Sequence, residues 1–114
     1  MIFDQGDIIK VDFNPTIGHE PKNERPALVV SNFEFNRATS MTIVCPITKT
    51  ENAFFLHEPI PIGYLTQGVV VMEQVRALDL DNRGAIKVER IDEKDLKPIL
   101  VCLSSFFTTD GGAA

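Results

Sequence analysis

The side chains best suited to chemistry gather in two polar segments of the chain. The first is NPTIGHEPKNER at residues 14–25, and the second opens with Thr48 and Lys49. A polar connection of about twelve residues inside a compact domain is usually functional or disordered. The first segment carries His19, Glu20, Lys22, Glu24 and Arg25. Lys22, Arg25 and Lys49 permit a local anion site, and the pKa of histidine near neutral pH makes His19 a candidate general base.

Several common catalytic chemistries lack their motifs in this sequence. It contains no GxSxG serine motif and no GxGxxG or GxxxxGK[ST] phosphate loop. Its histidines and carboxylates show no metal-ligand spacing, so neither a metal nor another cofactor is expected. Cys45 and Cys102 lie in the apolar runs TIVCPI and ILVCLSS without CxxC spacing. We expect them to be reduced and buried as small hydrophobic side chains.

Length and charge limit the class of protein. The 114 residues, 44% of them hydrophobic, fit one domain over residues 1–108 with a disordered tail at 109–114. A net charge of −5 argues against a general nucleic-acid coat protein but permits a local basic groove. No apolar run is long enough for a membrane span, and Asp4 and Asp7 stand where a secretory signal would be basic. We therefore expect a cytoplasmic protein without a membrane partner.

The elements that would position these side chains are mainly strands. Apolar and β-branched runs predict strands at 7–13, 26–32, 41–48, 58–63, 68–78 and 85–91, with a turn or short helix at 33–40. The run 26–32 is predicted to be buried on both faces, and 68–78 to be the central strand. Pro46 predicts a nearby sheet edge, and Pro59 and Pro61 predict an edge strand or extended segment.

The last element is predicted to be a helix with Asp92 as its N-cap. Pro98 either kinks this helix or marks a start near Lys97. Three-and-four spacing predicts one apolar helix face, made of Leu96, Ile99, Leu100, Leu103, Phe106 and Phe107. Short strands followed by one helix favour a mainly β fold, either a strongly twisted sheet or a small barrel with the helix covering an open side.

Three segments in order resemble the MazF/PemK toxin family. They are GDIIKVDFNPTIGHEPKNERPALVVSN from residue 6, CPIT at 45–48 and VVVMEQVRALD at 69–79. With the C-terminal helix, the resemblance covers essentially residues 6–107. It implies a small SH3-like, CcdB/PemK-type barrel that forms a homodimer and cleaves single-stranded RNA at short sequences. It also implies inhibition by a cognate antitoxin that lays an acidic, flexible segment into the RNA groove, with DNA bound only through the toxin–antitoxin complex.

The resemblance also implies roles for particular residues. The arginine of Arg-Pro and the threonine of Pro-x-Thr are the catalytic pair, which carry over to Arg25 and Thr48. Glu20 of Gly-x-Glu helps to shape the active-site loop, with a structural role about as well supported as direct proton transfer. The RNA-binding positions are predicted to be His19, Lys22, Lys49, Gln74 and Arg76. Gln74 and Arg76 would share one strand face, with Glu73 and Val75 on the other.

Such an enzyme needs no metal, because RNA supplies its own nucleophile in the 2′-OH. The expected products are a 2′,3′-cyclic phosphate and a 5′-OH, with the Arg25 guanidinium offsetting charge on the phosphorane. Two other classes stay open: a CcdB-like topoisomerase poison and a non-catalytic barrel that acts as a binding module. Neither requires Arg25 or Thr48, so alanine at these positions would separate the classes. Phe54 and Phe55 could stack bases, although packing or dimer contact is favoured for at least one of them.

Overall fold

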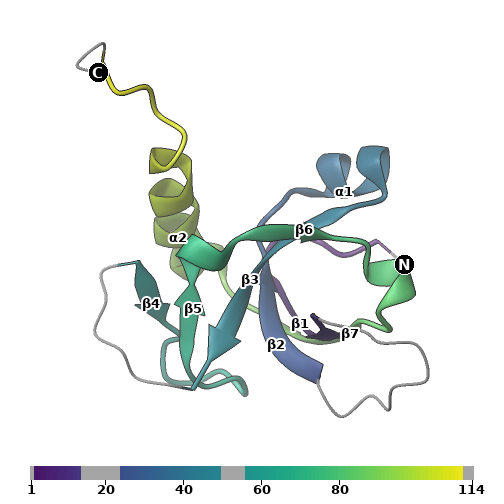
Figure 1. Ribbon diagram of the computed structural model, residues 1–114. Helices are drawn as coiled ribbons and strands as arrows, with labels where there is room; N and C mark the ends of the chain where they lie inside the picture. The colour runs from purple at the N-terminus through teal and green to yellow at the C-terminus, as the bar shows by residue number, and fades with distance from the viewer. Residues whose placement is uncertain (1, 14–23, 50–55, 112–114) are drawn as a thin grey trace.

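The computed structural model describes residues 2–13, 24–49 and 56–111. Along the chain lie β1 (Asp7–Asp12), β2 (Glu24–Val29), α1 (Phe33–Thr39), β3 (Thr42–Thr48), β4 (His57–Pro59), β5 (Val69–Val71), β6 (Arg76–Leu78), β7 (Ile86–Arg90) and α2 (Glu93–Ser105). Two 3₁₀ turns, η2 (Met72–Gln74) and η3 (Leu80–Asn82), follow β5 and β6 (Figure 1). His19, Glu20, Lys22, Phe54 and Phe55 lie outside the described residues, as do the last three residues of the predicted tail.

The strands form one antiparallel sheet in the order β4-β5-β3-β2-β1-β7, with β6 also paired to β3. The predicted central strand over 68–78 is wrong. That run divides into β5, η2 and β6, and β3 lies at the centre instead. β2 pairs along one edge of β3, while β6 and β5 share the other edge. β4, which contains Pro59, is an edge strand, as the prolines predicted.

The predicted sheet edge at Pro46 is also wrong, because Pro46 lies inside β3 and pairs with Ala27 of β2. On the opposite edge of β3, pairing with β6 extends to Val44 and pairing with β5 begins at Ile47. Pro46 therefore sits where one ladder has ended and the next has not begun. A proline has no N–H to donate, and this position in an interior strand is one that tolerates its loss.

Both faces of the sheet cover a hydrophobic core. Leu28 packs in a cluster with Ile8, Cys45, Val70 and Met72, which α2 closes with Leu96, Ile99 and Leu103. Ala27 and Val29 belong to a second cluster with Ile9, Val11, Val44 and Leu78. β2 is thus buried on both faces, as predicted. The fold is mainly β and antiparallel with a C-terminal helix. Pairings among the described strands run as an open path from β4 to β7, so closure into a barrel stays a prediction.

α2 begins at Glu93, which excludes the predicted start near Lys97 and places Pro98 inside the helix. Asp92 occupies the N-cap position, but its side chain makes no capping hydrogen bond. The Tyr64 hydroxyl instead accepts from the Asp92 backbone N–H at 2.8 Å and donates to the Asp95 carboxylate at 2.7 Å. No helix within the described ranges is long and apolar enough to cross a membrane.

Most of the predicted apolar face of α2 is buried or packed against the core, but Phe107 is 79% exposed. The helix ends at Ser105, so its periodicity no longer places Phe107 on that face. Both cysteines are free, with Cys45 buried and Cys102 half-buried.

Gly68 provides a test of how tightly β5 is joined to the end of β3. Its φ is +127°, and a Cβ there would lie 2.3 Å from the Thr48 carbonyl oxygen. We expect Gly68→Ala to lower the free energy of unfolding by about 3 kcal/mol or more, since backbone strain and steric overlap each cost about 1–3 kcal/mol. Gly84→Ala is the matched control: φ is +63° with open space around it, and the expected loss is about 1 kcal/mol. Urea denaturation measures both, and equal losses would contradict the predicted contact.

Candidate RNA-binding and cleavage site

One cleft of about 550 Å³ brings together four of the residues predicted from the sequence. Arg25 comes from β2, Thr48 from the end of β3, Gln74 from η2 and Arg76 from the start of β6. These residues are up to 51 positions apart in the chain. The pairing of β3 with β2 on one edge and with β6 and β5 on the other brings them to one place. The cleft is therefore assembled by the sheet rather than by any one loop.

The two arginines give this cleft its positive charge. Arg25 is exposed and lies opposite Val11 in the β1–β2 ladder. The Arg76 guanidinium carbon lies 5.5 Å from the centre of the Phe13 ring, a distance at which a cation is attracted to the ring face. Neither guanidinium forms an ion pair with a carboxylate of the described residues. Both are available to an anionic ligand, and a guanidinium fits phosphate oxygens in a bidentate manner.

Two contacts with the start of β5 fix the backbone at Thr48. It pairs with Val69 of β5, and the close approach of Gly68 to its carbonyl fixes the backbone where β3 ends. Its half-buried side chain lines the same cleft as Arg25. A hydroxyl at a rigid strand end can donate a hydrogen bond to a phosphate oxygen without first being ordered.

The lining residues that sequence reasoning missed include Phe13, His57 and Glu73. The His57 Nε2 and the Glu73 Oε2 are 2.9 Å apart. Strand alternation had placed Glu73 on the face opposite Gln74, but η2 ends that alternation and both residues line the cleft. The pairing of His57 with Val71 brings the imidazole beside η2, and no local motif in the sequence signals that long-range contact.

Not every predicted site residue reaches this cleft. Lys49 is exposed beyond the end of β3 and is not among the residues that line it. The positions of His19, Glu20 and Lys22 fall outside the described ranges. In the described part of the chain, no three His, Cys, Asp or Glu side chains are grouped closely enough to hold a metal ion.

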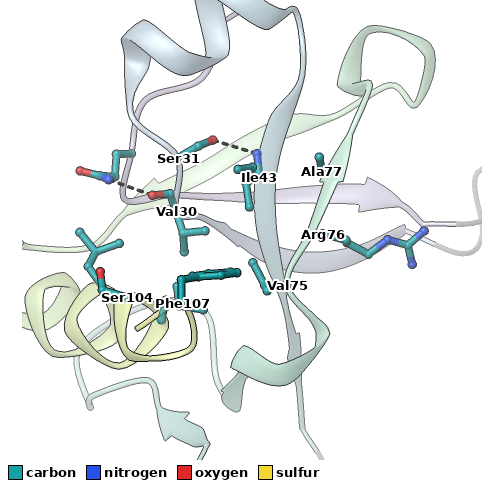
Figure 2. Close-up of a pocket in the computed structure, with 11 residues that line it drawn as sticks. Val30, Ser31, Ile43, Val75, Arg76, Ala77, Ser104 and Phe107 are labelled. Carbon is teal, nitrogen blue, oxygen red and sulfur yellow. Dashed lines mark hydrogen bonds between the residues drawn. The ribbon is translucent and has the colours of Figure 1, made fainter. Parts of the chain in front are cut away.

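A second, largely apolar groove of about 510 Å³ lies between α2 and the strands β3 and β6. Figure 2 shows Val30, Ile43, Val75 and Phe107 around it, with Ser104 on the helix side. Arg76 lines both the groove and the cleft, and its guanidinium extends away from the apolar side chains in Figure 2. The two hollows are therefore neighbours on either side of β6.

An antiparallel sheet with a terminal helix and an arginine-lined cleft defines a small β protein suited to an anionic ligand. Residues 4–107 match the family of PemK-like, MazF-like toxins of type II toxin–antitoxin systems. The chain is 36% identical over 109 residues to the endoribonuclease PemK of Escherichia coli, covering 92% of this chain and 82% of that protein. It belongs to the MazF/PemK toxin family.

Solved structures share the fold. MazF from Deinococcus radiodurans matches with a TM-score of 0.80 at 28% identity, covering 93% of this chain and 96% of that one. A MazE–MazF complex from the same organism contains a chain that matches with a TM-score of 0.79 at 24% identity, covering 93% of this chain and 95% of that one. The predicted MazF/PemK resemblance is confirmed by the family match and these relatives.

The core next to the cleft contains a thiol that we expect to be inert. Cys45 precedes Pro46, which lines the cleft. Burial, and to a smaller extent the nearby Glu73 charge, raises the pKa of the Cys45 thiol to about 12. Below that pH the group stays a neutral thiol, and the thiolate is the nucleophilic form. Iodoacetamide at pH 8 should therefore leave Cys45 unmodified in the folded protein, as read by peptide mass spectrometry. Alkylation in urea, where both cysteines should react, is the control. Modification of Cys45 in the native protein would contradict the burial.

Proposed function

We propose that this chain is an endoribonuclease toxin that cleaves single-stranded RNA through attack of the 2′-OH on the adjacent phosphate. The products are a 2′,3′-cyclic phosphate and a 5′-OH, and no metal takes part. The observation that carries the proposal is the cleft in which Arg25 and Arg76 stand beside Thr48, with neither arginine paired to a carboxylate of the described residues. The match to the toxin family and to a relative named as an endoribonuclease supports it.

The reaction needs little more than charge stabilisation and a held geometry. The 2′-OH gives up its proton as its oxygen bonds to phosphorus, and negative charge grows on the non-bridging oxygens. The bond from phosphorus to the 5′ oxygen then breaks, and that oxygen takes up a proton to leave as the 5′-OH. Arg25 projects from a paired strand, so its guanidinium can meet that charge from a rigid support. Thr48 donates a hydrogen bond to a phosphate oxygen, and Arg76 binds a neighbouring phosphate from across the cleft. Glu20 is proposed to shape the catalytic loop, with His19, Lys22 and Lys49 extending the RNA contacts.

The antitoxin is proposed to inhibit by occupying the same cleft. An acidic, flexible segment would offer carboxylates to Arg25 and Arg76, and a segment of that kind folds as it binds. A mycobacterial endoribonuclease of the same fold was solved in complex with its cognate antitoxin, which supports this proposal. DNA contacts are proposed to come through the antitoxin in the toxin–antitoxin complex. Cleavage of RNA places the action of the toxin in the cytoplasm.

Replacing Arg25 tests the chemistry directly. Purified, antitoxin-free protein in EDTA should cut a mixed-sequence single-stranded RNA and leave cyclic-phosphate ends. Arg25→Ala should lower kcat by about 100-fold to 1,000-fold, the usual loss when one donor to a transition-state oxyanion is removed. Thr48→Ala should lower it by a smaller factor, because a neutral hydrogen bond is weaker than a charged one.

The matched control is Arg37→Ala. Arg37 is exposed on α1 and pairs with Glu34 at 2.8 Å, outside the cleft, so this variant should cut like the parent protein. If the folded protein cuts no RNA of any sequence, that result would contradict the ribonuclease proposal and favour a topoisomerase poison or a binding module. Full activity of Arg25→Ala would show that Arg25 takes no part in catalysis.

We also propose that the protein is a homodimer in which α2 and the free edge of β6 meet a second copy. Within the described residues β6 pairs only with β3, so its other edge presents unpaired backbone groups. The apolar groove is lined by residues of β6 and α2, and Val101 on α2 and Phe107 beyond it are 69% and 79% exposed. Because Arg76 lines both hollows, such a dimer places the two clefts close to its interface.

Charge on this surface should separate the protomers. Val101→Asp should shift the mass measured by light scattering after size exclusion from dimer toward monomer, because an unpaired carboxylate at an apolar interface is costly to desolvate. Ile86→Asp on β7, a site 58% exposed and away from the groove, is the control and should stay dimeric. Retention of the dimer mass in Val101→Asp would place the interface elsewhere.

A further inference from the structure

The cleft also contains a negative charge, which is unexpected in a site for a polyanion. Glu73 lines the cleft together with both arginines, and its side chain is 38% exposed. Phosphate would be repelled there. Partly exposed ion pairs contribute about 0–1 kcal/mol to stability, so the His57–Glu73 pair by itself gives little structural reason for a carboxylate in this place.

The carboxylate is nevertheless held firmly. His57 is only 10% exposed at its side chain and meets the Glu73 Oε2 at 2.9 Å. His57 is fixed in turn by the pairing of β4 with β5, where it lies opposite Val71. The Met72 backbone N–H donates to the Leu56 carbonyl at 3.2 Å, which anchors the start of η2. An acceptor that is already ordered loses little entropy when a ligand binds to it.

The charges in the cleft are also kept apart. Glu73 pairs with His57, and none of the ion pairs between described residues joins it to Arg25 or Arg76. The cleft therefore offers two kinds of group, guanidinium groups that can bind phosphate and a separate carboxylate that can still accept hydrogen bonds through its second oxygen and the remaining lone pair of Oε2. Gln74 follows directly in η2, is exposed, and adds an amide that both donates and accepts.

We propose that Glu73 in the cleft binds the Watson–Crick edge of an unpaired guanine beside the cleaved phosphate. This inference rests on the proposed ribonuclease function and names a feature of its substrate. Guanine is the only RNA base that presents two adjacent N–H donors, at N1 and N2, and a carboxylate accepts both side by side. The Gln74 amide then donates to guanine O6.

The other three bases match the hydrogen-bonding groups of Glu73 and Gln74 less well. Adenine and cytosine each offer one amino group next to a ring-nitrogen acceptor, which would face the second carboxylate oxygen. Uracil offers one N–H between two carbonyl oxygens. Each of these bases leaves like charges facing each other or a hydrogen bond unmade, and unpaired polar groups in a binding site are the main source of discrimination. Unstacked bases in single-stranded RNA are read on this edge.

The test begins with a random-sequence single-stranded RNA library, cut in EDTA and sequenced at the new 5′-OH ends. Guanine should be enriched about tenfold at one position beside the cut, the discrimination expected of a good bidentate contact. Glu73→Gln should remove that enrichment, because an amide cannot accept two N–H donors. Glu93→Gln, a matched change on the exposed first turn of α2, should leave it intact.

A matched pair of oligonucleotides then isolates the contact. Replacing the selected guanosine with inosine removes the N2 amino group, and should lower kcat/KM about tenfold for the parent protein but not for Glu73→Gln. Cleavage without guanine enrichment, or enrichment that persists in Glu73→Gln, overturns this inference and leaves the ribonuclease standing. A library that is not cut at all overturns the ribonuclease and this inference together.

Discussion

Along one edge, β3 pairs first with β6 and then with β5, and the geometry of the cleft depends on that change of partner. β6 covers Thr42–Val44, β5 covers Ile47 and Thr48, and the chain between them leaves the sheet as η2. That departure turns Glu73 and Gln74 into the cleft instead of alternating them across a strand. It also falls beside Pro46, which has no N–H to offer a continuous ladder. A single uninterrupted strand over 68–78 would leave Arg25 and Thr48 without these neighbours.

The sequence predicted the parts of the fold that follow from local patterns. Alternation and β-branching located most of the strands, and the double burial of β2 follows from its unbroken apolar run. The division of 68–78 was not predictable in this way, because Val69 to Leu78 reads as one β-rich segment until Gly68 and the partners of β3 are known. Likewise, the exposure of Phe107 depends on where α2 ends, which the helical period alone does not determine.

The residues of the candidate site also fall into those that the sequence predicted and those that only tertiary contacts revealed. Arg25, Thr48, Gln74 and Arg76 came from an ordered resemblance, and the structure places all four around one cleft. His57 and Phe13 needed tertiary contacts to be noticed. His57 reaches the site through the β4–β5 pairing, and Phe13 lies beneath the Arg76 guanidinium. Isolated aromatic and imidazole side chains are common in any sequence, so they carry a signal only once the ladder places them beside known groups.

The charge distribution explains how a chain with a net charge of −5 can act on a polyanion, and it limits what else can fill the cleft. Ions screen exposed charges beyond about 10 Å at ordinary salt, so the two arginines of the cleft matter more to a bound phosphate than distant acids do. Under the proposed function, RNA would place phosphates at the arginines and a base at Glu73. An acidic antitoxin segment would meet only the arginines with its carboxylates. At Glu73 it would need a hydrogen-bond donor, because a carboxylate there would be repelled. The polarity of the cleft therefore constrains its inhibitor as well as its substrate.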